Sequence, residues 1–265
     1  MIGSKDSYAL ITGASSGMGY DYAKLFAKDG KNIVVLARSR DKLEELKADL
    51  EKQHGTKVMV LVKDLSDPKA PQEVFSELER AGINVDVLVN NAGFAVYGKF
   101  SDSDWQKEAE MLQVNVFALT HLTKLFLPKM MQRKSGRIMN ISSVAGWAPM
   151  PLWSVYAATK AYVLSFSEAL ARDVRGSGVK VTCFCPTVTQ TLFFKRSNSE
   201  NCAAYKRRVL LMDSETAARK GYRALVKGKT CVIAGLASSL MVFFLGRFAP
   251  RGLGIRLSQM LSAPT

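Results

Sequence analysis

The chain has 265 residues, 48% of them hydrophobic and 23% charged, which is the composition of an ordinary globular protein able to bury one sizeable core. Its first apolar run, residues 8–11, is short and leads straight into a glycine loop, so nothing resembles a secretory signal and we expect a cytoplasmic protein. The formal net charge of +14 comes with no nucleic-acid-binding motif, so we expect no nucleic-acid partner.

Apolar runs rich in β-branched residues alternate along the chain with segments of helical period, such as residues 41–53 with leucines on one face. The predicted strands are Tyr8–Thr12, Asn32–Ala37, Lys57–Lys63, Val85–Asn90, Gly136–Ile141, Lys180–Cys185 and Thr230–Ile233. Near-continuous apolar strands separated by helices predict a sheet covered on both faces. We therefore predict an α/β fold with a doubly wound, mostly parallel, seven-stranded sheet, in one domain over residues 1–265.

The first predicted strand runs into a glycine-rich loop, which reads Thr-Gly-Ala-Ser-Ser-Gly-Met-Gly over residues 12–19. Glycines allow the backbone to turn tightly and to approach a pyrophosphate, which then lies at the positive end of a helix dipole. The alternative is a glycine-rich turn without a ligand. The position between the first strand and the first helix favours a dinucleotide site.

The second predicted strand ends in Ala37, followed by Arg38. A protein that binds NAD usually has an acid at position 37 for the ribose 2′-hydroxyl, whereas a 2′-phosphate requires a cation. A guanidinium fits a phosphate both by charge and by its forked geometry. This pattern therefore predicts NADP(H) as the cofactor. The alternative is that Arg38 is merely solvated at the end of the strand.

Residues 93–100, Gly-Phe-Ala-Val-Tyr-Gly-Lys-Phe, nearly match the phosphate-binding loop of nucleoside triphosphatases. The last position of that motif must be Ser or Thr to reach magnesium, and Phe100 cannot do this. The stretch also follows the fourth predicted strand rather than the first. A kinase or ATPase is therefore excluded.

Ser143, Tyr156 and Lys160 follow the fifth predicted strand and have the chemistry of a proton transfer. Tyr156 and Lys160 lie one helical turn apart on the same face. A phenol, with a pKa of about 10, is a poor acid–base catalyst at pH 7 unless a cation stabilises the phenolate. We expect Lys160 to be that cation and Ser143 to hydrogen-bond the substrate oxygen.

No metal site is predicted. The four cysteines have no metal-type spacing, and Cys183 and Cys185 alternate on a predicted buried strand, as core thiols do. The two histidines, His54 and His121, are interpreted as structural, which argues against a Ser-His-Asp hydrolase.

These motifs together resemble those of the short-chain dehydrogenases/reductases, in the single-domain branch similar to 17β-hydroxysteroid dehydrogenases and 3-ketoacyl reductases. The resemblance covers about residues 7–235 and includes the glycine loop, Asn-Asn-Ala-Gly at 90–93, Asn115, Ser143 and the Tyr-x-x-x-Lys pair. Asp64 matches the family's adenine-binding aspartate. One departure is Thr187, where the family usually has glycine, and this leaves the local backbone conformation open.

The resemblance implies an NADP(H)-dependent oxidoreductase that reduces a ketone or other carbonyl, or oxidises the matching secondary alcohol. Tyr156 would protonate the carbonyl oxygen and Ser143 would polarise it. Lys160 would lower the Tyr156 pKa and bind the nicotinamide ribose, and Asn115 would hold a water. The predicted catalytic residues are Asn115, Ser143, Tyr156 and Lys160. The predicted cofactor-binding residues are Gly13, Ser15, Ser16, Gly17, Met18, Gly19, Arg38, Asp64, Leu65, Asn91, Ala92, Gly93, Tyr156, Lys160, Pro186, Thr189 and Thr191.

The segments expected to line the substrate pocket, residues 94–100, 144–153 and 187–213, are apolar with few acids. Their large side chains are Phe94, Val96, Tyr97, Trp147, Met150, Leu152, Trp153, Leu192, Phe193 and Phe194. This favours a hydrophobic carbonyl substrate, such as a 3-oxoacyl or steroid-like compound, unless several of the aromatics simply pack the core. A non-catalytic NADP-binding sensor or scaffold is the alternative function, but such proteins usually lack the intact Tyr/Lys pair.

The C-terminal part of the chain is basic and apolar. Residues 192–265 carry 13 Lys/Arg against 3 acids, and the apolar run from 231 to 246 is too short to span a membrane. We expect the tail, about residues 236–265, to be a subunit interface, a lid over the active site or a peripheral membrane contact. Long helices at about 104–131 and 154–177 are expected to pair across a two-fold axis in a homodimer or homotetramer.

Overall fold

The computed structural model describes residues 7–206, 211–247 and 250–264. Within them a seven-stranded sheet has the order β3-β2-β1-β4-β5-β6-β9, and all its neighbouring strands pair in parallel. The strands are β1 (Tyr8–Thr12), β2 (Asn32–Ala37), β3 (Val58–Val62), β4 (Val85–Asn90), β5 (Gly136–Ile141), β6 (Val179–Cys185) and β9 (Cys231–Ile233). The predicted doubly wound α/β fold is confirmed, and each strand end lies within one residue of its predicted position.

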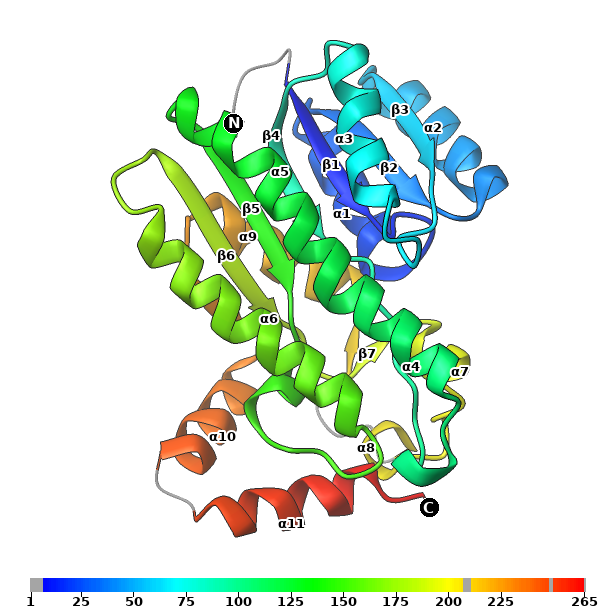
Figure 1. The fold of residues 1–265 in the computed structure, drawn as a ribbon, viewed down its shortest axis with the longest axis vertical. Helices are drawn as coiled ribbons and strands as arrows, with labels where there is room; N and C mark the ends of the chain where they lie inside the picture. The colour runs from blue at the N-terminus through cyan, green and yellow to red at the C-terminus, as the bar shows by residue number, and fades with distance from the viewer. Residues whose placement is uncertain (1–6, 207–210, 248–249, 265) are drawn as a thin grey trace.

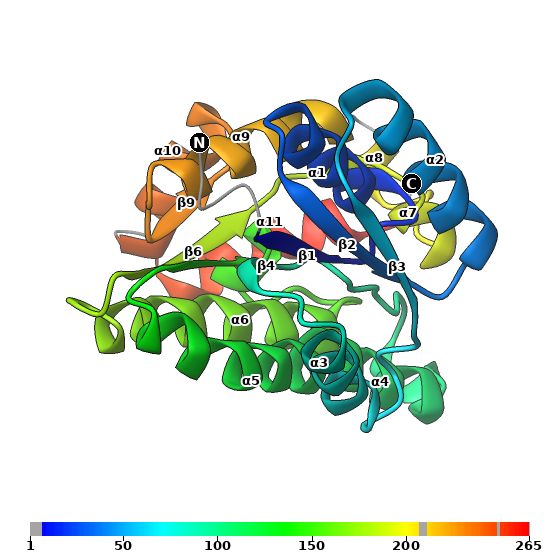
Figure 2. The same ribbon diagram turned by 90° about the horizontal axis from the view of Figure 1, so that it is seen from above.

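Helices cover both faces of this sheet (Figure 2). One layer holds α1 (Gly17–Lys28), α2 (Arg40–His54) and α9 (Ser214–Val226), and the other holds α3 (Ala70–Arg80), α5 (Leu119–Gln132) and α6 (Ser154–Asp173). The leucine face predicted for the second helix is buried: Leu43, Leu46 and Leu50 are at most 1% exposed. Each layer therefore packs its own apolar cluster against the sheet, which holds the strand ends in fixed positions.

The helix expected at 104–131 is one continuous rod with a change of type inside it. It begins as α4 (Trp105–Leu112), passes through a π-helical segment (Gln113–Ala118) and continues as α5. Short 3₁₀ turns lie at Phe100–Asp102 and Val144–Trp147. π-helical segments are frequent at functional sites, and this one contains Asn115.

Between β6 and α9 the chain forms small elements that the sequence did not predict. These are β7 (Thr189–Gln190), α7 (Phe193–Arg196), α8 (Ala203–Lys206) and β8 (Met212–Asp213), which pairs with β7. They lie beyond the carboxyl end of β6, where the substrate side of the crevice is expected (Figure 1).

The tail folds into two helices, α10 (Leu236–Arg247) and α11 (Arg251–Ser262), and returns to the main body (Figure 1). The Tyr97 hydroxyl donates to the Ser262 carbonyl oxygen at 2.6 Å, and the Ser258 hydroxyl donates to the Pro149 carbonyl oxygen at 2.6 Å. The Ala203 N–H also donates to the Ala263 carbonyl oxygen at 2.9 Å. The end of the chain is thus attached to segments on the substrate side. Across the described residues, no helix is both long enough and apolar enough to cross a lipid bilayer.

Candidate active site

The glycine loop after β1 depends on the absence of side chains at defined points. Gly13 and Gly17 have positive φ values of 69° and 56°, which other residues adopt only with strain. A Cβ atom on Gly19 would lie 2.3 Å from the carbonyl oxygen of Gly13. Only glycine at 19 allows the first turn of α1 to pack this closely on the loop.

Thr12 fixes the opening between β1 and β4, where the strand order reverses. Its hydroxyl accepts hydrogen bonds from the N–H groups of Asn91 and Ala92, both at 2.9 Å, and donates to Val89. The Asn91 side chain donates back to the Thr12 carbonyl oxygen at 2.9 Å. Ligands of doubly wound sheets bind at this switch point, so these bonds hold both walls of the expected cofactor cleft.

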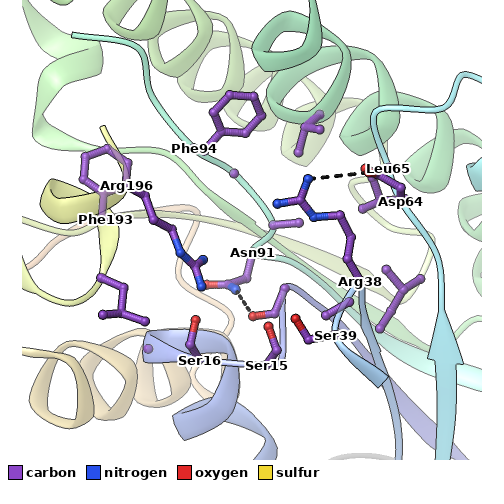
Figure 3. A pocket seen from close by; sticks show the side chains of 18 of the residues that line it. Ser15, Ser16, Arg38, Ser39, Asp64, Leu65, Asn91, Phe94, Phe193 and Arg196 are labelled. Atoms are coloured by element: carbon purple, nitrogen blue, oxygen red, sulfur yellow. Dashed lines mark hydrogen bonds and ion pairs between the residues drawn. The ribbon is translucent and has the colours of Figure 1, made fainter. Parts of the chain in front are cut away.

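A cleft of about 240 Å³ lies at this position (Figure 3). Its lining includes twelve of the predicted cofactor-binding residues: Gly13, Ser15, Ser16, Gly17, Met18, Arg38, Asp64, Leu65, Asn91, Ala92, Gly93 and Thr191. Gly19 lies beneath the loop instead of lining the cleft, whereas Tyr156, Pro186 and Thr189 line a neighbouring pocket, and Lys160 is in the lining of neither cavity.

Two arginines enter the cleft from opposite walls (Figure 3). Arg38 pairs with Asp64 at 3.5 Å, and both side chains are well exposed. Burial alone would raise the pKa of Asp64, but hydrogen bonds from Ser66 and the charge of Arg38 outweigh it and lower the pKa. Such an exposed ion pair contributes little to the stability of the fold. Arg38 can therefore leave Asp64 and bind a phosphate with little loss of folding free energy. Arg196, on α7, was not predicted, because nothing in the sequence around it indicates that α7 faces the cleft.

Ser143, Tyr156 and Lys160 are brought together by the packing of α6 on the end of β5. The Ser142 hydroxyl donates to the Lys160 carbonyl oxygen at 2.7 Å. A Cβ atom on Gly146 would lie 2.7 Å from the same carbonyl oxygen, so glycine allows the turn after Ser143 to approach α6. The Ser143 hydroxyl interacts with the Tyr156 hydroxyl, and the Lys160 ammonium lies 5.7 Å from the centroid of the Tyr156 ring.

Burial dominates the proton affinities of this group. It raises the pKa of Tyr156 to about 12, against the opposing effect of the Ser143 hydrogen bond. It lowers the pKa of Lys160 to about 8, because a buried ammonium loses its hydration. The sequence suggested that Lys160 would lower the pKa of Tyr156. In the structure the Tyr156 pKa lies above its ordinary value, since the side chain is only 9% exposed and Lys160 lies over its ring and donates to the Ile141 carbonyl oxygen at 3.0 Å.

Asn115 lies in the π-helical segment and connects three elements. Its side chain donates to the Phe94 carbonyl oxygen at 2.9 Å and to the Thr159 hydroxyl at 3.2 Å, and it accepts from the Phe94 N–H at 3.1 Å. A Cβ atom on Gly93 would lie 2.9 Å from the Asn115 side-chain oxygen and 3.5 Å from the Lys160 nitrogen. Gly93 therefore allows both side chains to approach the wall of the cleft.

An apolar pocket of about 140 Å³ adjoins the cleft and shares Met18, Thr191 and Phe193 with it. Ser143 and Tyr156 lie in its wall. Thr187, the departure from the family pattern, is also there and is 7% exposed. Among the described residues other than glycine, only Lys134, Leu152 and Asn198 have positive φ, so threonine at 187 causes no backbone strain.

Of the apolar side chains expected around the substrate, four line this pocket: Met150, Trp153, Phe193 and Phe194. Phe94 and Leu192 instead line the cofactor cleft, and Val96, Tyr97 and Leu152 pack in the aromatic cluster around Trp153. Trp147 is 38% exposed. Cys202, Ala204 and Leu261 also line the pocket. Cys202 and Ala204 lie in the segment 187–213 that was expected to line the pocket, whereas no sequence signal places Leu261 there, because it reaches the pocket only through the folding of α11.

Comparison with known proteins agrees with this arrangement. The family model described as short chain dehydrogenase matches residues 7–201. A very-long-chain 3-oxoacyl-CoA reductase from Anas platyrhynchos is 33% identical over 197 residues, which cover 72% of this chain. The chain spans only 62% of the length of that relative.

Solved structures match over nearly the whole chain. A short-chain dehydrogenase from Sphingobium yanoikuyae in complex with NADPH has a TM-score of 0.82 and 31% identity, covering 93% of this chain and 94% of that one. A 7β-hydroxysteroid dehydrogenase has a TM-score of 0.85 and 26% identity, covering 95% and 96%. The family model matches most of the length of the chain, and the fold and the motif positions agree with it. The chain therefore belongs to the short-chain dehydrogenase/reductase family, and it is similar to the 3-ketoacyl reductases within that family.

Proposed function

We propose that this protein is an NADP(H)-dependent reductase of hydrophobic ketones. One observation carries the proposal: the Tyr156 and Ser143 side chains line an apolar pocket that adjoins the polar cofactor cleft. A carbonyl group in the pocket would meet both hydroxyls. The non-catalytic alternative is not favoured, since both hydroxyls and the lysine are present and close together.

The cleft fits a phosphorylated dinucleotide. Gly13 and Gly19 leave the backbone without side chains at the start of α1. Arg38 follows β2, and the side chain that carries its guanidinium is 72% exposed. That guanidinium would hold a 2′-phosphate, and Arg196 on the opposite wall adds a second positive charge. NADPH, when bound, supplies the hydride.

Tyr156 would act as the proton donor. With a pKa of about 12, its hydroxyl stays protonated at neutral pH and can donate to the oxygen of a reduced carbonyl. Ser143 would hydrogen-bond the same oxygen. Lys160 donates one of its three N–H bonds to Ile141, which leaves donors for a ribose on the cleft side. Asn115 positions the strand end that carries Gly93, through its two bonds to Phe94.

The substrate class follows from the pocket walls. They are aromatic and aliphatic apart from Ser143, Cys202, three threonines and the hydroxyl of Tyr156, which favours an apolar ketone over a sugar. The similar very-long-chain 3-oxoacyl-CoA reductase and 7β-hydroxysteroid dehydrogenase are consistent with this choice. The pocket has a volume of about 140 Å³, and Leu261 of the tail lies in its wall.

A panel of carbonyl compounds tests this proposal. Purified protein is mixed with NADPH or NADH and with aliphatic ketones, 3-oxoacyl thioesters, keto-steroids and keto-sugars, and nicotinamide absorbance is followed. We expect turnover with NADPH and the apolar ketones. Turnover restricted to keto-sugars, or equal efficiency with NADH, would contradict the substrate or cofactor part of the proposal, respectively.

We also propose a homo-oligomer. Trp105, Phe117 and Tyr162 are 68%, 61% and 40% exposed, and they belong to the rod α4–α5 and to α6, the helices expected to pair between subunits. Burial of these side chains against a second copy would remove a large apolar area from water. Light scattering should give at least twice the 29.1 kDa mass of the chain, and a monomer at micromolar concentration would contradict this.

The tail supports a proposal of peripheral membrane contact for a cytoplasmic protein. Leu236 and Leu240 on α10 and Leu253, Leu257 and Met260 on α11 are 37–78% exposed. No acidic residue follows Glu215, which suits an anionic lipid surface. Within the tail, residues 248 and 249 lie outside the described ones, and the side chains of Phe243, Leu245, Arg247 and Arg251 are not described either.

Vesicle co-sedimentation tests the contact. We expect binding to anionic vesicles and not to neutral ones, with loss of binding when Leu253 and Leu257 are both replaced by serine. Equal recovery of wild type and variant with anionic vesicles would contradict the proposal.

A further inference from the structure

We propose that Cys183, Cys185 and Cys231 form a binding site for a soft metal ion, a function separate from nicotinamide chemistry. Their three sulfur atoms all lie within 4.8 Å of one another, and those of Cys183 and Cys185 are 3.9 Å apart. Three of the four cysteines in the chain therefore converge on one point.

Sheet geometry explains this convergence. Cys183 and Cys185 are two residues apart on β6, so their side chains point to the same face. β9 pairs with β6 in a register that places Cys231 directly beside Cys183, on that same face. The spacing of cysteines along the sequence gave no metal pattern, because Cys231 arrives from a strand far along the chain.

The sulfur positions suit a coordinated ion. Metal–sulfur bonds of about 2.3 Å place three ligands about 3.8–4.0 Å apart in tetrahedral or trigonal geometry. The distance of 3.9 Å between Cys183 and Cys185 already has this value. Thiolates select Zn²⁺ and Cu⁺ over Mg²⁺ and Ca²⁺, so the site would take a thiol-seeking ion. A disulfide would use only two of the three sulfurs.

The site has an entrance at the edge of the sheet. β9 is the last strand, and Cys231 is partly exposed, whereas Cys183 and Cys185 are fully buried. The carboxyl group of Glu168, on the exposed side of α6, interacts with the Cys231 thiol. An arriving cation would meet Glu168 and Cys231 first and then the buried pair.

A bound ion would fasten the short edge strand β9 to β6. β9 pairs with β6 through only three residues, and the chain continues from it into α10. Because the ion binds the folded protein and not the unfolded chain, it should raise the Tm. The thiols must lose protons to bind, so binding should release protons into the buffer.

A metal titration of the full-length protein tests this site. The protein is first reduced with a phosphine and freed of metal by a chelator. It is then titrated separately with Zn²⁺ and with Cu⁺ in the presence of competing indicator chelators. We expect one ion of at least one kind per chain, proton release in calorimetry, and a Tm rise of roughly 5 °C or more at a hundredfold excess over Kd. Cd²⁺ should give the thiolate charge-transfer band in the ultraviolet.

Cys231→Ser should weaken binding at least a hundredfold, and Cys185→Ala provides a second variant should the first fold poorly. Cys202→Ser, which changes the one cysteine outside the cluster, should bind as the wild type does. The proposal is overturned by no binding of either ion, by equal binding in Cys231→Ser, or by a disulfide between Cys231 and a β6 thiol in protein purified without oxidant. None of these readouts uses enzymatic turnover, so failure here leaves the proposed reductase activity intact.

Discussion

The proposed cofactor side and the proposed substrate side of the crevice are built in different ways. On the cofactor side, backbone groups and short polar side chains are fixed by hydrogen bonds, as at Thr12, and by glycines with no room for a Cβ atom. On the substrate side, aromatic rings pack around Trp153, with centroids 4.8 Å away at Tyr97 and 5.7 Å away at Tyr156. The tail then covers this side through Leu261.

This difference predicts different responses to substitution on the two sides. The hydrogen-bonded side tolerates few substitutions, since one added methyl group at Gly19 would collide with backbone. The apolar side depends on shape, and volume-conserving changes there are usually tolerated. We therefore expect substitutions on the first side to abolish binding or chemistry and those on the second to change substrate preference.

The largest effect is expected from Tyr156→Phe, at the junction of the two sides. Loss of the proton donor should lower kcat by about 10²–10⁴-fold, while the Kd for NADPH changes little because the ring remains. Steady-state rates and fluorescence titration of NADPH measure the two quantities. A variant that keeps more than a tenth of the wild-type kcat would show that another group donates the proton.

The cofactor side can be tested through Arg38. Replacing Ala37 with Asp and Arg38 with Leu should raise the Kd for NADPH by about 10–100-fold, the value of one or two charge-assisted hydrogen bonds, and should favour NADH. Arg196→Leu gives a comparison, because Arg196 contacts the cleft from the other wall. If it lowers affinity for NADPH and NADH equally, its partner is a phosphate that both cofactors share.

The sequence placed many residues of the larger cleft together, and the reason is physical. Strand ends and glycine turns are local features, and parallel strands bring their carboxyl ends to one edge, so Gly13, Asp64 and Asn91 could be placed together before the fold was known. Leu261 could not be placed, because its position depends on how α11 packs over the pocket. Arg196 and Cys231 were missed for the same reason: each reaches its neighbours through tertiary contacts and not through spacing along the chain.

The pH dependence of reduction connects the two sides through Lys160. Its pKa of about 8 means that the ammonium is charged below that value and becomes neutral above it. If the charged form is required, kcat/KM for reduction should fall up to tenfold per pH unit as the pH rises above 8. In Lys160→Arg the fall should disappear, since a guanidinium stays charged, even where the absolute rate is lower. A profile that stays flat from pH 7 to pH 10 in the wild type would contradict this role.

A smaller effect is expected from Leu261→Ala on the substrate side. The shorter side chain enlarges the pocket, so kcat/KM for a bulky ketone should rise by about tenfold relative to that for a small ketone. Leu257→Ala is the matched control, because Leu257 lies one turn away on the same helix and is 37% exposed. Equal changes in the two variants would mean that the tail acts through its overall stability and not through the pocket wall.

The smallest effect is expected from Thr187→Val. The Thr187 hydroxyl is buried in the pocket wall and has no hydrogen-bond partner among the described residues. A buried hydroxyl without a partner costs free energy, so its retention is explained if a bound ligand supplies the partner.

Valine at position 187 keeps the shape of the side chain and removes the hydroxyl. We expect the KM for a ketone, or the Kd for NADPH, to rise about 2–10-fold, as for the loss of one neutral hydrogen bond, with no loss in Tm. Thr182→Val is the control, because Thr182 also has a buried hydroxyl without a partner but lies within β6, outside both cavities. If both variants leave KM and Kd unchanged, Thr187 only fills space, and other groups of the crevice hold the ligand.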